Sequence, residues 1–179
     1  MNEKVKLLDE NDVKRALTRL SYEIEEKCAD PDNIVLVGIK TRGVPIANIL
    51  ADNIELHTGK RPPICELDIT FYRDDLTKIN TDPTVKEITL GTDINNKEVI
   101  ICDDVLYTGR TVRAAVEAIF SKGRPGRIGL AVLIDRGHRE LPIRPDYIGK
   151  NVPTSKKEVI KVNFKEIDGS TSVILYEQD

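Results

Sequence analysis

Four short candidate strands constrain the fold most, 34–39, 64–70, 99–102 and 128–134, and all of them except 64–70 are runs of almost continuous apolar residues. Runs of this length and composition are typical of strands that are buried on both faces of a parallel sheet. Helical patterns follow the first and third runs, at 44–56 and 111–120, and a last short strand is expected at 173–176. The sequence therefore predicts an α/β fold with a mainly parallel sheet flanked by helices.

One domain is expected over 1–179, because this length suffices for one well-buried core and no repeat or linker interrupts it. Near the start, apolar residues recur at helical spacing from Val13 to Cys28, with Asn11 as the expected N-cap. Residues 71–92 are polar and poorly periodic. We expect this segment to lack strong secondary structure and to be either functional or mobile.

Composition excludes several classes of protein. The first ten residues are charged and lack the apolar stretch of a signal peptide, and no apolar run approaches the roughly 20 residues that span a bilayer. The three cysteines are widely spaced, which predicts reduced thiols in the cytoplasm and neither a disulfide framework nor a zinc site. With only two histidines, a histidine-based metal site is not expected.

Charge is distributed unevenly along the chain. The net charge is −3, yet residues 122–165 contain eleven Lys or Arg against four acids. This asymmetry suggests one basic face on an otherwise acidic molecule, which could contact nucleic acid. The alternative is an ordinary solvated surface rich in lysine and arginine.

The segment that carries chemistry is 99–111, in which an apolar strand leads into Asp103 and Asp104 and then into Thr108, Gly109 and Thr111. The carboxyl ends of strands are where open α/β sheets bind ligands. The start of the following helix offers unpaired N–H groups to an anion, and Gly109 allows the backbone to approach a phosphate closely. Two carboxylates beside a phosphate cradle suit a sugar phosphate, because they accept hydrogen bonds from ribose hydroxyls while a divalent cation offsets the repulsion. The alternative is an acidic N-cap pair on an ordinary loop.

This string resembles the phosphoribosyl-pyrophosphate signature of the type I phosphoribosyltransferases. The resemblance implies a parallel-sheet fold with a small hood, at about 135–160 plus the N-terminal segment, and a substrate, 5-phosphoribosyl-1-pyrophosphate (PRPP), that is used with Mg²⁺. It also implies that Asp103 and Asp104 are catalytic and contact Mg²⁺ mostly through PRPP and water. The residues implied to bind PRPP are Lys40, Thr41, Arg42, Asp103, Asp104, Val105, Leu106, Tyr107, Thr108, Gly109, Arg110 and Thr111.

Two loops outside this string fit the same resemblance. Residues 38–43 resemble the loop that holds pyrophosphate through backbone N–H groups, in which a cis peptide is expected at Lys40–Thr41. Residues 71–92 resemble the loop that closes over the reacting sugar, and Arg73 is then a catalytic contact to pyrophosphate.

A narrower resemblance comes from residues 133–150, together with Leu106-Tyr107 and residues 16–20. These segments resemble the bifunctional pyrimidine operon regulators, which are also uracil phosphoribosyltransferases. The resemblance implies UMP formation from uracil, binding of UMP or UTP, binding of operon leader RNA, and a homodimer or larger homo-oligomer. It implies that Tyr147 and Ile148 bind the base. The implied RNA contacts are Thr18, Arg19, His138, Arg139, Arg144 and Lys150.

Tyr107 separates uracil from purines. Related purine enzymes usually place at this position an aspartate that handles the proton at purine N7, whereas tyrosine, with a reference pKa near 10, is a poor base at neutral pH. Uracil N1–H is appreciably acidic, so we expect its loss to need less help as the C1′ bond breaks. The alternative function is a phosphoribosyltransferase without an RNA-regulatory role, with purines among the bases that it admits.

Overall fold

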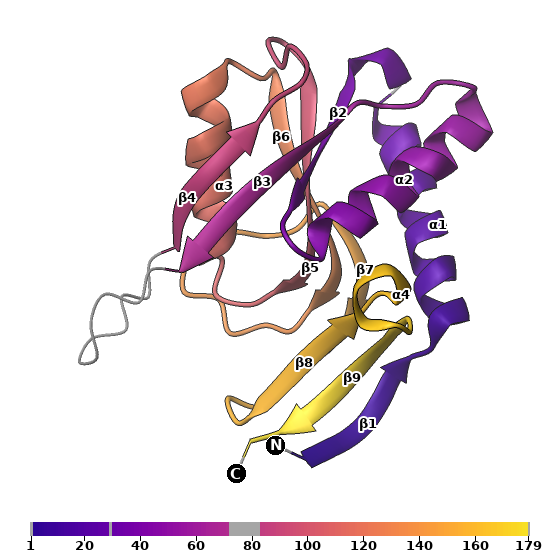
Figure 1. Ribbon diagram of the computed structural model, residues 1–179, viewed down its shortest axis with the longest axis vertical. Coiled ribbons are helices and arrows are strands. Elements are labelled where there is room, and N and C mark those ends of the chain that lie inside the picture. The colour runs from indigo at the N-terminus through magenta and orange to yellow at the C-terminus, as the bar shows by residue number, and fades with distance from the viewer. Residues whose placement is uncertain (1, 29, 72–82, 179) are drawn as a thin grey trace.

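A six-stranded sheet and a three-stranded sheet make up the chain (Figure 1). The structure is a computed structural model that describes residues 2–28, 30–71 and 83–178, with the backbone alone for 70, 71 and 83–89. The strands are β1 (Asn2–Leu8), β2 (Ile34–Ile39), β3 (Ile64–Phe71), β4 (Pro83–Thr89), β5 (Glu98–Leu106), β6 (Arg127–Asp135), β7 (Tyr147–Asn151), β8 (Glu158–Asn163) and β9 (Ser172–Glu177). The helices are α1 (Glu10–Lys27), the 3-10 turn η1 (Pro31–Asn33), α2 (Gly43–Thr58), α3 (Arg110–Lys122) and α4 (Lys165–Asp168).

The larger sheet has the strand order β4-β3-β2-β5-β6-β7. Its neighbours from β3 to β7 are parallel, and only β4 runs antiparallel to β3. The prediction of a mainly parallel sheet flanked by helices is therefore confirmed. Because β2, β5 and β6 lie side by side in the same direction, the loops that follow them open at the same edge of the sheet.

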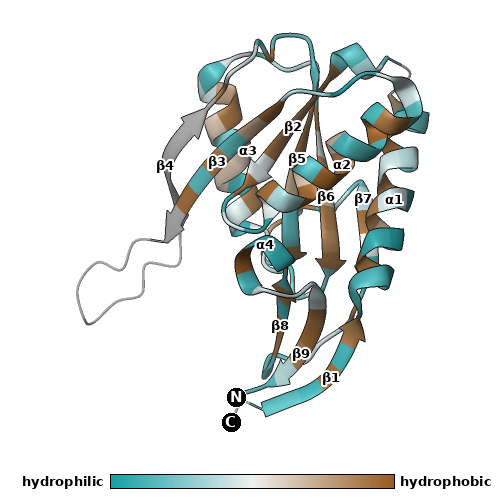
Figure 2. Ribbon diagram, turned by 45° about the vertical axis from the view of Figure 1, so that its right-hand side comes forward, coloured by the Kyte–Doolittle hydropathy of each residue, from teal (hydrophilic) through white to brown (hydrophobic). Residues whose placement is uncertain are grey.

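Two apolar clusters fill the two faces of this sheet. On one face, α1 and α2 pack over alternate residues of β2, β5 and β6, and β7 adds Tyr147. On the other face, α3 packs over the remaining alternate residues. In Figure 2 the central strands are brown along much of their length, as expected of strands covered by helices on both faces.

The smaller sheet is antiparallel, with the order β1-β9-β8, and lies beyond the carboxyl ends of the central strands (Figure 1). Its buried residues, among them Val162 and Val173, belong to the same apolar cluster as α1 and α2. This packing fixes the smaller sheet beside the edge at which the ligand loops of the larger sheet open.

The sequence patterns missed or misplaced several boundaries. The N-cap of α1 is Asp9 and not Asn11: the side chain of Asp9 accepts from the Asp12 N–H at 2.8 Å, and Asp12 reciprocates in a capping box. The prediction that 71–92 lacks strong secondary structure is wrong for its second half, which contains β4. No strand was predicted at β1, β7 or β8. Among the described residues, no helix is both long and apolar enough to cross a bilayer.

Candidate functional site

Strand β5 places Asp103 and Asp104 in the centre of the open edge, between β2 and β6. The two carboxylates bond locally: Asp103 Oδ1 accepts from the Asp104 N–H at 2.9 Å, and Asp104 Oδ1 accepts from the Val105 N–H at 2.8 Å. Burial, followed by the charge of Asp104, raises the pKa of Asp103 well above its usual value. Burial also raises the pKa of Asp104, against the Val105 N–H bond and the charge of Arg42. A ligand that brings hydroxyl donors or a cation would stabilise both carboxylates in their ionised form.

The loop after β5 forms the start of α3. Gly109 is the N-cap, with φ of 93° in the left-handed region that favours glycine. No side chain caps this helix, although Thr108 Oγ1 lies 3.4 Å from the Arg110 nitrogen. The first turn of α3 therefore presents backbone N–H groups beside Asp103 and Asp104, as a phosphate site requires.

The loop after β2 lies against the same carboxylates. The Lys40–Thr41 peptide is cis, the geometry that the resemblance implied. A Cβ on Gly43 would lie 2.2 Å from the carbonyl oxygen of Cys102, the residue before Asp103. Only glycine allows this approach, so Gly43 brings residues 40–42 next to Asp103.

The side chains of this loop are held by acids. Lys40 Nζ lies 3.1 Å from Glu66 Oε2, and Arg42 Nη2 donates to Asp168 Oδ1 at 2.8 Å. Arg42 Nε is buried and has no hydrogen-bond partner among the described residues. The positive charge of Arg42 favours the ionised form of Asp104, so Arg42 is a candidate contact for an anionic ligand at this edge. Arg73, the other predicted pyrophosphate contact, lies outside the described residues.

The expectation that Tyr147 stacks on a base is wrong for this structure. Its ring is 0% exposed and lies under α1, with Lys27 Nζ 4.5 Å from the ring centroid. Side chains alternate along a strand, and Tyr147 falls on the core side of β7. Ile148 is half-buried, and its carbonyl oxygen already accepts from Arg19 Nη2 at 3.0 Å.

A cavity of about 380 Å³ opens instead at the carboxyl ends of β6 and β7. Its wall adjoins residues 107–109 between β5 and α3, named the phosphoribosyl loop after the resemblance, because the guanidinium of Arg136 stacks over the Tyr107 ring at 4.1 Å. Arg136 is 7% exposed and also donates to the Glu158 carbonyl at 2.7 Å, which ties the wall to the smaller sheet. The lining residues are Asp135, Arg136, Gly137, His138, Arg139, Asn151, Pro153 and Thr154.

Residues 151–154 were missed because no strand was predicted at β7. Had Tyr147–Asn151 been read as a strand, the residues after it would have fallen at the same edge as those after β5 and β6. Thr154 is tied to the opposite wall: its carbonyl oxygen bonds His138 Nε2, and its hydroxyl accepts from Arg136 Nε at 3.1 Å.

The predicted RNA contacts fall into two groups. Thr18, Arg19 and Lys150 lie where α1 packs on β7, since Arg19 Nη2 donates to the carbonyls of Ile148 and Gly149. Arg144 is exposed in the connection before β7. His138 and Arg139 instead line the cavity at the carboxyl edge.

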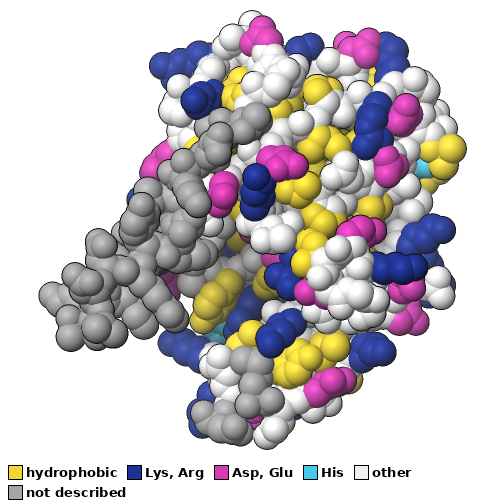
Figure 3. Space-filling model, viewed as in Figure 1, with side chains coloured by type: hydrophobic (Ala, Val, Ile, Leu, Met, Phe, Trp, Pro, Cys, Tyr) yellow, Lys and Arg dark blue, Asp and Glu magenta, His cyan; other side chains and the backbone are white. Residues whose placement is uncertain are grey.

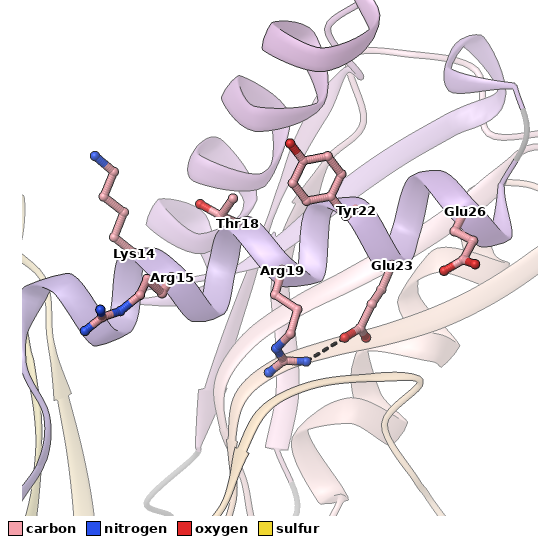
Figure 4. A pocket seen from close by; sticks show the side chains of 7 residues that line it. All are labelled: Lys14, Arg15, Thr18, Arg19, Tyr22, Glu23 and Glu26. Atoms are coloured by element: carbon pink, nitrogen blue, oxygen red, sulfur yellow. Dashed lines mark hydrogen bonds and ion pairs between the residues drawn. The ribbon is translucent and has the colours of Figure 1, made fainter.

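The outer face of α1 carries a shallow groove of about 450 Å³ (Figure 4). Lys14 and Arg15 lie at one end and Glu26 at the other, and Arg19 pairs with Glu23 at 2.5 Å. Charges of both signs are also mixed over the face drawn in Figure 3. The single basic face that charge counting suggested is therefore not seen on either surface.

Comparison with known proteins places residues 5–167 in the phosphoribosyl transferase domain family. The bifunctional protein PyrR of Clostridium perfringens is 58% identical over 177 residues, which cover 99% of each chain. The bifunctional protein PyrR of Clostridioides difficile is 56% identical and covers 99% of this chain and 100% of its own length.

Among solved structures, a hypoxanthine phosphoribosyltransferase from Staphylococcus aureus superposes with a TM-score of 0.76 at 22% identity, covering 98% of this chain and 92% of that one. A hypoxanthine phosphoribosyltransferase from Trypanosoma cruzi superposes with a TM-score of 0.78 at 15% identity and the same coverage. At this identity the likeness shows a shared fold and leaves the choice of base to the site itself.

Proposed function

Because this chain belongs to the phosphoribosyl transferase domain family, and within it to the bifunctional PyrR proteins, we propose that it transfers the phosphoribosyl group of PRPP to uracil. The products are UMP and pyrophosphate. The observation that carries the proposal is the single edge at which the partly buried pair Asp103 and Asp104, the start of α3, the 40–42 loop and the 380 Å³ cavity meet.

Each part of PRPP has a matching part of this edge. The 5-phosphate fits the N–H groups at the start of α3, and the ribose hydroxyls fit the carboxylates of Asp103 and Asp104. The pyrophosphate fits the backbone of residues 40–42, where the cation of Arg42 adds attraction. The base fits the cavity between β6 and β7, next to Tyr107. Arg73 is kept as a further pyrophosphate contact.

In the reaction, the bond from C1′ to the pyrophosphate oxygen breaks as the bond from C1′ to uracil N1 forms. The sugar gains oxocarbenium character, as in other glycosyl transfers, and the carboxylate pair beneath it favours that positive charge. The proton of uracil N1 passes to water or to the departing pyrophosphate, since Tyr107, whose ring faces Arg136 beside the cavity, is a poor base at neutral pH. The fit to uracil over purines thus rests on Tyr107.

Magnesium fits the donors that this site offers. Among the described residues, no group of three or more His, Cys, Asp or Glu side chains could hold a metal. Asp103 and Asp104 alone suit Mg²⁺, which keeps several waters and is bound mainly through substrate phosphates. Bound in this way, Mg²⁺ supplies charge neutralisation on the departing pyrophosphate.

The same family membership supports a second role in binding pyrimidine-operon leader RNA, with uridine nucleotides favouring the bound state. Arg19 and Lys150 are exposed where α1 packs on β7, Thr18 is half-buried on the same helix, and Arg144 is exposed before β7. His138 is kept as a further candidate. Exposed arginine and lysine suit RNA phosphates and unstacked bases. A filter-binding assay with leader RNA tests this role: UMP should strengthen binding, and equal binding to an unrelated hairpin would contradict it.

Two further properties are proposed from the resemblance. The chain forms a homodimer or larger homo-oligomer, which light scattering of the purified protein would test. It works in the cytoplasm, a reducing compartment that suits its three free and buried cysteines.

The transferase proposal is tested by incubating the purified chain with PRPP, uracil and Mg²⁺ and following UMP and pyrophosphate. The two products should form in equal amounts, and a chelator should abolish both. Release of pyrophosphate without UMP would contradict transfer to uracil.

A further inference from the structure

We propose that Arg139 is a positioning residue for phosphoribosyl transfer, which holds the base cavity and the phosphoribosyl loop at a fixed separation. The inference rests on the proposed function. The contacts that carry it lie inside the protein, and the prediction that Arg139 also contacts RNA stays a separate hypothesis.

The guanidinium of Arg139 bonds four acceptors on three segments. Nη2 donates to both carboxylate oxygens of Asp135, at 2.7 and 2.6 Å. Nη1 donates to the Tyr107 carbonyl at 2.7 Å, and Nε donates to the Ile143 carbonyl at 3.0 Å. The side chains of Arg139 and Asp135 are 22% and 11% exposed, so the pair is largely shielded from water.

The bonded segments are the two halves of the proposed site. Asp135 ends β6 and lines the cavity, and its Oδ1 also accepts from the Gly137 N–H at 3.0 Å. The Tyr107 carbonyl directly precedes Thr108 and Gly109, the start of the phosphate cradle. One guanidinium therefore sets where a base in the cavity lies relative to a sugar on the cradle.

The segment that carries Arg139 is itself held in an unfavourable conformation. His138, the preceding residue, has φ of 57°, a region that residues other than glycine rarely adopt. Such a backbone persists where surrounding contacts fix it, and it is frequent at ligand sites. Beside the Arg139 bonds, the Glu140 and Leu141 N–H groups both donate to the Thr108 carbonyl, at 3.0 and 3.2 Å. The 138–141 segment is thus fastened to the phosphoribosyl loop from both backbone and side chain.

Lysine could not replace this arginine. The planar fork of a guanidinium reaches acceptors in several fixed directions, whereas an ammonium is a point charge with freely rotating donors. Loss of the fork also leaves the Asp135 carboxylate partly buried without its cation. We therefore expect Arg139→Lys and Arg139→Gln to disturb the same step, with lysine giving at most partial recovery.

The effect of such a change should be selective. Most of the PRPP contacts proposed above lie on β5, α3 and the 40–42 loop, which Arg139 touches only through the Tyr107 carbonyl. Asp135, which lines the proposed base cavity, is bonded directly by Arg139. The KM for uracil should therefore rise and kcat should fall, while the KM for PRPP changes little.

Steady-state kinetics of Arg139→Gln, Arg139→Lys and the wild type test the inference, with Arg124→Gln as a control arginine that is exposed and far from the cavity. The KM for uracil should rise by about ten-fold or more in Arg139→Gln, with a fall in kcat and less than about a three-fold change in the KM for PRPP. Arg124→Gln should match the wild type. If Arg139→Gln fails to fold, the same selective pattern in Arg139→Lys carries the test.

Two results would overturn this inference and leave the proposed function intact. One is wild-type kinetics in both Arg139 variants, with or without weaker binding of leader RNA. The other is an equal rise of both KM values, which would indicate a general loss of structure. A wild-type chain that forms no nucleotide would instead refute the proposed function, and the inference with it.

Discussion

Replacing Gly43 by alanine puts a methyl group where the carbonyl oxygen of Cys102 already lies. The added Cβ would be 2.2 Å from that oxygen, whereas real Cβ contacts essentially never fall below 3.0 Å. The start of α2 and β5 must therefore separate by about 0.8 Å or more. Both neighbours are backbone atoms, so no side-chain rotation can relieve the overlap.

This separation should lower activity, because proposed PRPP contacts lie next to both Gly43 and Cys102. Cys102 precedes Asp103, and Gly43 follows the 40–42 loop, so the change moves the proposed ribose contacts away from the proposed pyrophosphate contacts. A misplacement of about 1 Å can cost on the order of 100-fold in rate, and overpacking a buried position costs about 1–3 kcal/mol of stability. We expect Gly43→Ala to lower kcat/KM for PRPP by about 100-fold and to lower the free energy of unfolding within that range.

The measurement pairs steady-state kinetics with urea unfolding, and Gly91→Ala is the matched control. A Cβ on Gly91 meets no atom within 4 Å, so this variant should keep its activity and be unchanged or slightly more stable, by at most about 1 kcal/mol. If Gly43→Ala kept kcat/KM within about three-fold of the wild type, the close approach of these two segments would not matter for catalysis, and the reasoning would be refuted.

The remaining predictions concern the two proposed functions. Asp104→Asn removes a hydroxyl acceptor and a negative charge at constant size, so kcat/KM should fall about ten-fold or more, roughly 1.4 kcal/mol on the transition-state scale; unchanged kinetics would exclude Asp104 from the reaction. Tyr107→Phe keeps the ring that stacks on Arg136, so the pH–rate profile should keep its shape and change only in height, and loss of one limb would reveal a general base. Arg144→Gln and Lys150→Gln should weaken leader-RNA binding while uracil transfer stays near wild type, and each lost phosphate contact should flatten the dependence of log K on log salt by about 0.7–0.9. Wild-type RNA binding in both variants would support a merely solvated surface.

The parts of the fold that could be predicted from sequence are the ones buried on both faces. β2 is buried at every position, and β5 and β6 are buried over 99–102 and 129–134, which gives continuous apolar runs. β1 is exposed at five of its seven positions, so it has no apolar signal and is stabilised by pairing with β9. β4 is defined by its antiparallel pairing with β3, a long-range contact that a local pattern does not contain.

In the candidate site, too, the residues of one local motif could be predicted, whereas the surroundings of the others could not. Asp103, Asp104 and the loop to Gly109 follow one continuous strand-to-helix motif, and the structure keeps them together at one edge. The prediction that Tyr147 contacts the base was wrong because a position in a motif does not decide which face of β7 the side chain occupies. Arg139 looked like one more surface cation in a basic segment, and only the fold reveals the carboxylate and carbonyls around it.

The choice of base tests the central claim most directly, in a competition assay with equal concentrations of uracil, hypoxanthine and guanine, limiting PRPP and saturating Mg²⁺. The nucleotides formed are separated and counted after PRPP is consumed. Because Tyr107 provides no base for purine N7 and the cavity beside it adjoins the phosphoribosyl loop, UMP should be the dominant product. An excess of GMP or IMP over UMP would contradict the assignment to uracil.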